Sequence, residues 1–256
     1  MKKFILDLQV AANTRLHSDY VLLRLSSSSA LPPMMAGQFA QIRVDHTPSV
    51  FLRRPISIHY VDSERREVWF LIRIAAPGTL RLSELEVGET VNVILPLGHP
   101  FSMPACPGAK VLLVGGGVGC APLLYLGQQL ASAGTRPAFL IGARSRDDLL
   151  QTDLFAALGD LYLTTEDGSA GQKGFVTNHS VLDAIDWQMV YSCGPTPMMK
   201  AVARFARAKG IDCEVSLENR MACGIGACLC CVEDTVDGNL CVCREGPVFN
   251  IKRLKW

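Results

Sequence analysis

Four cysteines near the C-terminal end restrict what this 256-residue chain can fold into more than any other feature. The first three have the spacing C-x4-C-x2-C, which is that of plant-type [2Fe–2S] ligation, and thiolates are soft ligands that suit iron. Gly224 and Gly226 lie between the first two, and glycine adopts positive φ without a clash. We therefore expect a loop that turns its N–H groups toward the sulfurs of a cluster. The predicted ligands are Cys223, Cys228, Cys231 and Cys243.

Zinc and disulfides are the alternative uses of these cysteines. Structural zinc sites usually have two similar C-x2–4-C pairs, unlike this asymmetric spacing. The ten cysteines are an even number, but no secretory hydrophobic region begins the chain, so we expect a cytoplasmic, reducing environment. Cys230 and Cys241 are alternative ligands. We favour Cys231, which completes the C-x2-C step, and Cys243, which lies close to a Gly-Pro turn.

Composition excludes several classes of function. The chain is 49% hydrophobic and 19% charged, which describes a globular protein with a large core. Its net charge of +1 provides no general field for nucleic acid or a membrane surface. No apolar run is long enough to span a bilayer. The mean hydropathy of +0.22 is high for a monomer and indicates a buried interface with a partner.

Three domains are predicted from the hydrophobic patterns. Residues 1–100 contain short alternating segments separated by turns such as Pro77-Gly78, which predicts an antiparallel six-stranded β-barrel without helices. Residues 101–217 alternate strands with helices, expected at 123–131, 148–158, 175–185 and 196–209, which predicts a parallel sheet covered on both faces. Residues 218–256 form a small subdomain around the cysteines.

A glycine-rich loop follows the first strand of the α/β region and opens a helix. Such a loop turns tightly and presents N–H groups to an anionic pyrophosphate at the helix start. A simple tight turn is the alternative, but the strand–loop–helix context favours a dinucleotide site. The glycines concerned are Gly115, Gly116, Gly117 and Gly119.

Three shorter motifs carry further candidate binding residues. Arg54-Pro55-Ile56-Ser57 places a guanidinium and a hydroxyl on one strand, where Arg offers a bidentate fork to phosphate and Ser57 a hydrogen bond to a flavin ring. The turn Gly78-Thr79 would meet the same diphosphate. Cys193-Gly194 ends a strand at the carboxyl edge of the sheet, where ligands bind in open α/β folds. Taken singly, each motif also fits a structural role.

In this order, the motifs resemble the ferredoxin–NADP reductase superfamily. With Ser216-Leu217-Glu218-Asn219-Arg220-Met221 before Cys223 and Arg244-Glu245-Gly246-Pro247 after Cys243, the chain is similar to the electron-transfer subunits of NAD-linked (class 1B) dihydroorotate dehydrogenases. The resemblance covers essentially the whole chain, and the cysteine segment is its most specific part.

The resemblance implies an oxidoreductase subunit of pyrimidine biosynthesis that has no catalytic residues for dihydroorotate. Electrons would pass from FMN in a catalytic partner subunit through the [2Fe–2S] cluster and FAD to NAD, in a heterotetramer of two copies of each subunit. NAD would lie near the glycine-rich loop, Cys193 and Gly194. The residues lining FAD would be Arg54, Pro55, Ile56, Ser57, Leu71, Ile72, Arg73, Gly78 and Thr79.

Two other functions fit part of the pattern. A FAD/[2Fe–2S] NAD(P)H reductase subunit serving ferredoxin, sulfide or hydrogenase would share everything except the partner, although the approach to Cys223 favours the dihydroorotate enzyme. The other alternative function is that of a zinc-stabilised nucleotide-binding regulator that catalyses no reaction. Arg144 and Arg146 follow the second strand of the α/β region, so NADP is an alternative to NAD.

Overall fold

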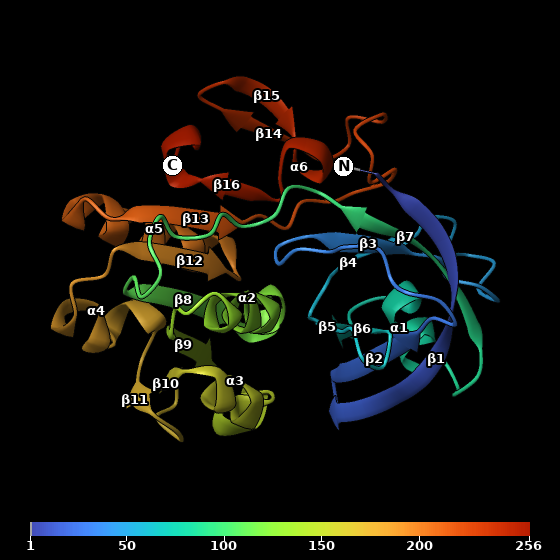
Figure 1. Ribbon diagram of the computed structural model, residues 1–256, viewed down its shortest axis with the longest axis horizontal. Coiled ribbons are helices and arrows are strands. Elements are labelled where there is room, and N and C mark those ends of the chain that lie inside the picture. Colours follow the sequence, from blue (N-terminus) through green and yellow to red (C-terminus); the bar gives the residue numbers. More distant parts are fainter. Residues whose placement is uncertain (1) are drawn as a thin grey trace.

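The computed structural model describes residues 2–256, which form two seven-stranded sheets and a separate hairpin. Figure 1 shows the N-terminal sheet beside the α/β region, with the C-terminal segment running along one end of both. Within residues 2–256, no helix has the length and apolar character needed to cross a bilayer.

The N-terminal sheet is antiparallel throughout, with the order β4-β3-β7-β1-β2-β6-β5. It has seven strands, not the six expected, because β5 is only three residues long and too short to show alternation. With β4 and β5 at its edges, the sheet is an open half-barrel. The strands are β1 (Phe4–His17), β2 (Tyr20–Ser26), β3 (Phe39–Ile42), β4 (Arg54–Ser57), β5 (Tyr60–Asp62), β6 (Glu67–Arg73) and β7 (Thr90–Leu97).

The prediction of a turn at Pro77-Gly78 is wrong, because a short helix, α1 (Pro77–Ser83), begins there. Proline is well suited to a first helical turn, where its missing N–H has no partner to lose. The hydroxyl of Thr79 accepts hydrogen bonds from the N–H groups of Ala75 and Ala76, at 3.0 and 3.2 Å. Seven residues are too few to show a helical period, so the proline and glycine suggested a turn.

The second sheet has the order β11-β10-β9-β8-β12-β13-β16 and is parallel apart from β16, which confirms the predicted α/β region. Alternate residues of β8 enter opposite cores: Val111 and Leu113 share one with α2 and α3, and Leu112 and Val114 share the other with α4 and α5. The elements are β8 (Val111–Gly116), α2 (Ala121–Ser132), β9 (Pro137–Ala143), α3 (Thr152–Leu158), β10 (Asp160–Thr165), β11 (Gln172–Lys173), α4 (Val181–Ala184), β12 (Met189–Cys193), α5 (Thr196–Lys209) and β13 (Asp212–Ser216).

Two predicted helices are shorter than expected. The segment 175–185 contains a 3₁₀ turn (Val176–Asn178) and the four-residue α4, because the Asn178 side chain accepts the N–H of Phe175 and closes a local turn. Helix α3 begins at Thr152, not near 148, because Gln151 adopts a left-handed conformation with φ of 54°.

The C-terminal segment is tied to the α/β sheet by its own last strand. It contains β14 (Val232–Thr235), β15 (Gly238–Cys241), α6 (Val242–Glu245) and β16 (Val248–Asn250). Strand β16 pairs with β13, with Val248 opposite Ser216. The cysteine-bearing residues therefore have a fixed position beside both sheets.

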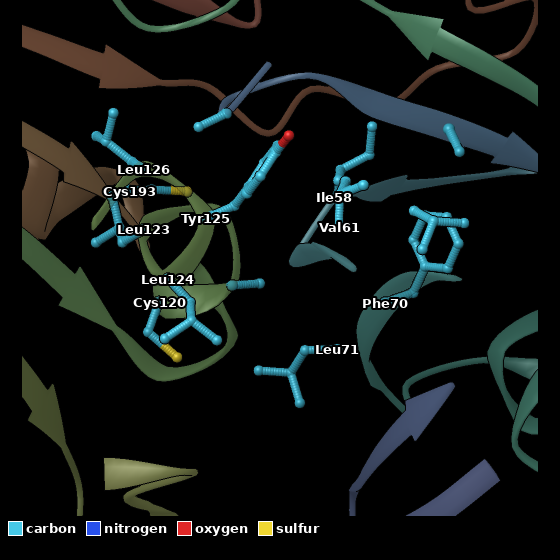
Figure 2. Close-up of a cluster of buried hydrophobic side chains, with 14 of the residues drawn as sticks. Ile58, Val61, Phe70, Leu71, Cys120, Leu123, Leu124, Tyr125, Leu126 and Cys193 are labelled. Atoms are coloured by element: carbon cyan, nitrogen blue, oxygen red, sulfur yellow. The ribbon is translucent and has the colours of Figure 1, made fainter. Parts of the chain in front are cut away.

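Helix α2 connects the α/β region to the half-barrel. Figure 2 shows Tyr125 directed from α2 toward the barrel side chains Ile58 and Val61. Its hydroxyl donates a hydrogen bond to the carbonyl of Met34 at 3.0 Å. Nearby, the fully buried His59 lies with Nδ1 2.7 Å from the Ala121 carbonyl. Apolar packing and buried hydrogen bonds thus fix the two regions together.

Substituting Tyr125 by Phe should lower the free energy of unfolding by about 0.5–1.5 kcal/mol, because the hydrogen bond to Met34 is lost while the ring still packs. The shift in the midpoint of urea denaturation measures this. Tyr162→Phe is the control, since its hydroxyl has no hydrogen-bond partner among residues 2–256. Equal midpoints for the two variants would contradict the role given to Tyr125.

Candidate cluster and nucleotide sites

The predicted ligand cysteines come together from three parts of the C-terminal segment. Cys223 and Cys228 lie in the loop before β14, Cys231 immediately precedes β14, and Cys243 lies in α6. The β14–β15 hairpin returns the chain to its start, pairing Val232 with Cys241, and α6 follows directly. As a result the N–H of Cys243 donates to Sγ of Cys231 at 3.4 Å.

The loop between Cys223 and Cys228 directs its N–H groups at sulfur, as expected. Three of them point to Cys223 Sγ, those of Ile225, Ala227 and Cys228, at 3.4, 3.3 and 3.4 Å. The N–H of Gly226 points to Cys243 Sγ at 3.1 Å. Gly224 and Gly226 have φ of 69° and 84°, so the loop needs the freedom of glycine at both positions.

The four cysteines form two pairs: the N–H of Cys228 donates to Cys223 Sγ at 3.4 Å, and the N–H of Cys243 donates to Cys231 Sγ at 3.4 Å. Among residues 2–256, no three cysteine, histidine or carboxylate side chains converge closely enough to share one metal ion. Two pairs suit a [2Fe–2S] cluster, in which four cysteines are divided between two irons. The donor set and its geometry therefore fit that cluster.

The environment of the two pairs differs. Cys231 and Cys243 are buried, Cys223 is half-buried and Cys228 is exposed. Burial raises the pKa of Cys223, but hydrogen bonds from the backbone N–H groups, first that of Ile225, outweigh it and lower the pKa to about 6. Burial, together with the neighbouring Cys231 thiol, raises the pKa of Cys243 to about 12. The Cys223 side of the site is thus accessible, and the Cys243 side is enclosed.

Three further cysteines, Cys230, Cys241 and Cys120, lie outside the two pairs. Cys230 is exposed, and Cys241 is buried with its N–H donating to Glu245 Oε2 at 2.9 Å. Cys120 is buried at the start of α2, and burial raises the pKa of its thiol to about 12. Nothing in the structure assigns these three a chemical role.

The two barrel motifs predicted to bind a diphosphate are in contact. The guanidinium of Arg54 packs against the first turn of α1, so that a Cβ added to Gly78 would lie 2.3 Å from Arg54 Nε. Nη1 of Arg54 donates to the Leu52 carbonyl at 2.8 Å. Strand β4, with Pro55, Ile56 and Ser57, is half-buried at the sheet edge. The Thr79 hydroxyl is occupied in capping α1.

The third barrel segment predicted to line FAD, residues 71–73, lies partly in the core and partly at a cavity. Leu71 and Ile72 are buried in β6. Arg73 is exposed and lines a cavity that extends from the barrel to the α/β sheet.

This cavity has a volume of about 690 Å³ and lies at the carboxyl ends of β8, β9, β10 and β12. Besides Arg73, Tyr20 lines it from the barrel, and three carboxylates, those of Asp148, Glu166 and Glu218, lie along its wall. The predicted residues that line it are Gly116, Gly117, Gly119 and Gly194.

Gly115 and Cys193 are buried and are not among the residues that line the cavity. Burial is the main cause that raises the pKa of the Cys193 thiol to about 12. The loop and the end of β12 are in close contact, because a Cβ added to Gly119 would lie 2.4 Å from the Cα of Gly194.

The sequence did not identify Tyr20, Asp148 or Glu166 as cavity residues. Tyr20 lies about a hundred residues from the glycine-rich loop in a strand of ordinary composition, so its position depends on how the two regions dock. The carboxylates follow strands that were predicted, but no motif marks them.

Two family models match the chain. Residues 218–255 match the iron-sulfur cluster binding domain of dihydroorotate dehydrogenase B, and residues 113–204 match the oxidoreductase NAD-binding domain. Among solved structures, the chain is similar to the NADH-dependent reduced ferredoxin–NADP oxidoreductase of flavin-based electron bifurcation, with a TM-score of 0.86 and 29% identity over 97% of this chain and 90% of that one. It also shares its fold with the ferredoxin reductase of carbazole 1,9a-dioxygenase, with a TM-score of 0.69 and 21% identity over 82% of this chain and 67% of that one.

Curated relatives are similar in sequence to this chain over most of its length. The electron transfer subunit of dihydroorotate dehydrogenase B (NAD(+)) from Shouchella clausii (strain KSM-K16) is 39% identical over 250 residues, or 95% of each chain. That from Bacillus cereus (strain Q1) is 44% identical over 223 residues, or 84% of this chain and 85% of the relative. The resemblance predicted from the motifs is confirmed: the chain belongs to the family of electron-transfer subunits of NAD-linked dihydroorotate dehydrogenase B.

Proposed function

We propose that this chain delivers electrons, taken from dihydroorotate by a partner subunit, to NAD. When bound, a [2Fe–2S] cluster and FAD supply the electron transfer, and the protein sets their position and environment. The observation that carries the proposal is the pairing of four thiols, with three N–H groups directed at Cys223 Sγ. The cluster ligands are then Cys223, Cys228, Cys231 and Cys243.

The N-terminal region, residues 1–100, holds FAD on its half-barrel. Arg54 supports this assignment, because its guanidinium lies against Gly78 and brings two phosphate-binding motifs to one place. Ser57 on β4 provides a hydroxyl for the flavin ring. Thr79 contributes by fixing the first turn of α1, since its hydroxyl is already hydrogen-bonded. Pro55, Ile56, Leu71, Ile72 and Arg73 complete the proposed lining.

The α/β region, residues 101–217, binds NAD in the 690 Å³ cavity. The glycine-rich loop, 115–119, takes the pyrophosphate, and Cys193 with Gly194 lies beside the nicotinamide. Several contacts favour NAD over NADP. Arg146 donates to the Ser169 carbonyl at 2.8 Å, Arg144 lies 3.6 Å from Asp148, and the carboxylates of Asp148 and Glu166 would repel a 2′-phosphate.

The partner is an FMN-containing catalytic subunit, in an assembly with two copies of each chain. The accessible side of the cluster segment, 218–256, supports docking there, because Ile225 and Leu229 are 46% and 65% exposed beside Cys223 and Cys228. Phe51, which is 91% exposed, precedes β4 on the barrel. Large apolar side chains in such positions are typical of an interface. No disulfide links any of the ten cysteines, which suits a reducing cytoplasm.

A second candidate is the FAD/[2Fe–2S] subunit of a different NAD(P)H reductase. The similarity to the ferredoxin–NADP oxidoreductase chain over 97% of this chain favours it, because the same cofactor sites would serve another partner.

Affinity purification of the whole protein from its native host distinguishes the two functions. We expect an FMN-containing partner in the eluate and reduction of NAD that depends on dihydroorotate. A brown eluate that reduces NAD only with another donor would support the second candidate. A colourless protein containing zinc would contradict both.

Cys231→Ser should remove the cluster while leaving FAD in place, because the buried pair loses a ligand. Iron, flavin and absorbance of the purified variant measure this. Cys230→Ser is the matched control, since this neighbouring thiol is exposed and outside both pairs. Retention of full iron in Cys231→Ser, or its loss in Cys230→Ser, would show that the ligand set is wrong.

Arg54→Ala should weaken FAD binding by roughly tenfold to a hundredfold, because a charge-assisted phosphate contact contributes about 1.5–3 kcal/mol. The fraction of chains with FAD after gel filtration measures the loss. Arg65→Ala removes an exposed arginine paired with Asp62 and should keep its flavin. Equal occupancy in both variants would contradict the phosphate contact.

Gly119→Ala should raise the Kd for NADH about tenfold, because the new Cβ would overlap Gly194 and force the two walls of the cavity apart. Equilibrium binding of NADH, with flavin content as a check of folding, measures this. Ser132→Ala is the control, since this exposed residue at the end of α2 does not line the cavity. An unchanged Kd in Gly119→Ala would exclude this contact from the nucleotide site.

A further inference from the structure

Gln41 is a fully buried polar residue that lies between two of the proposed cofactor segments. Its backbone belongs to β3 and pairs with Pro55 of β4, in the motif assigned to FAD. Its side chain reaches the loop that carries Cys223, where Nε2 lies 3.5 Å from the carbonyl oxygen of Ala222. This contact joins residues 181 positions apart.

The amide of Gln41 also occupies the space that Gly224 leaves by having no side chain. A Cβ added to Gly224 would lie 2.6 Å from Cγ of Gln41 and 2.8 Å from its Nε2. Ala222 and Gly224 are the two neighbours of Cys223 in the sequence. The Gln41 side chain therefore supports the ligand loop on both sides of Cys223.

Packing alone does not explain a glutamine at this position. Its Oε1 is buried and has no hydrogen-bond partner within residues 2–256. Leaving such an atom unsatisfied costs about 1–3 kcal/mol, and leucine would fill a similar volume without that cost. Arg53 holds the backbone from the other side, since its Nη1 donates to the Gln41 carbonyl at 3.3 Å.

We propose that Gln41 is a positioning residue for the cluster, holding Ala222 and Gly224 so that the loop N–H groups stay directed at Cys223 Sγ. Hydrogen bonds to a cluster sulfur raise the reduction potential, because they stabilise the added negative charge of the reduced form. Gln41 thereby helps to set the potential at which the subunit accepts an electron. The inference rests on the proposed function, since it requires a cluster at these cysteines.

A redox titration of the whole flavin-containing protein, followed by electron paramagnetic resonance, tests this role. Gln41→Leu should lower the equilibrium constant for one-electron reduction of the cluster about tenfold, which corresponds to about 59 mV. Iron content and the FAD potential should not change. Gln128→Leu, on α2, is the matched control: the Nε2 of Gln128 donates to Tyr60 Oη at 2.8 Å, and its Oε1 is also buried with no hydrogen-bond partner in the described part of the chain. This variant should keep the wild-type cluster potential.

A wild-type cluster potential in Gln41→Leu would overturn the inference. If that variant does not retain iron, Gln41→Met decides, because it keeps the side-chain length and removes the donor facing Ala222 without adding a charge near the cluster. A lowered potential in Gln41→Met supports the positioning role, and a wild-type potential overturns it. Absence of any cluster signal from the wild-type protein would defeat the proposed function itself, whereas a normal signal insensitive to Gln41 defeats only this inference.

Discussion

The pairing of β16 with β13 is the interaction on which the arrangement of sites depends. It fixes the C-terminal segment to the α/β sheet, and the N–H of Leu217 reinforces it by donating to the Pro247 carbonyl at 2.9 Å. On the barrel side, the N–H of His99 donates to the Gly246 carbonyl. A short segment with little core of its own thus obtains a fixed position from the two sheets beside it.

This position explains how separate motifs serve one electron path. The loop that carries Cys223 contacts β3 through Gln41, β3 pairs with the motif on β4 that we propose for FAD, and the cavity that we propose for NAD extends from β6 to the glycine-rich loop. The enclosed thiols anchor the segment, while Cys228 and the apolar Leu229 remain exposed to a partner. In the proposed function, this exposed face receives electrons from the partner and the cavity at the sheet edge delivers them to NAD.

Local patterns predicted what depends on local geometry. Cysteine spacing together with Gly224 and Gly226 was sufficient to predict a loop with N–H groups aimed at sulfur, because both requirements lie within a few residues. Strand–loop–helix order likewise predicted the α/β region. What escaped prediction depends on contacts between distant residues or on elements too short to show a period. Gln41 meets the cluster loop across the interface of two regions, Tyr20 reaches the cavity from the barrel, and α1 and β5 have only seven and three residues.

The iron, sulfide and flavin content of the purified protein, together with its electron paramagnetic resonance spectrum, tests the central claim most directly. If the four thiols hold a [2Fe–2S] cluster, analysis should give two irons and two acid-labile sulfides for each FAD. Anaerobic addition of NADH should then produce a paramagnetic signal from the reduced cluster, in amount equal to the flavin. Zinc in place of iron, or a flavin that is reduced by NADH while no cluster signal appears, would contradict the account.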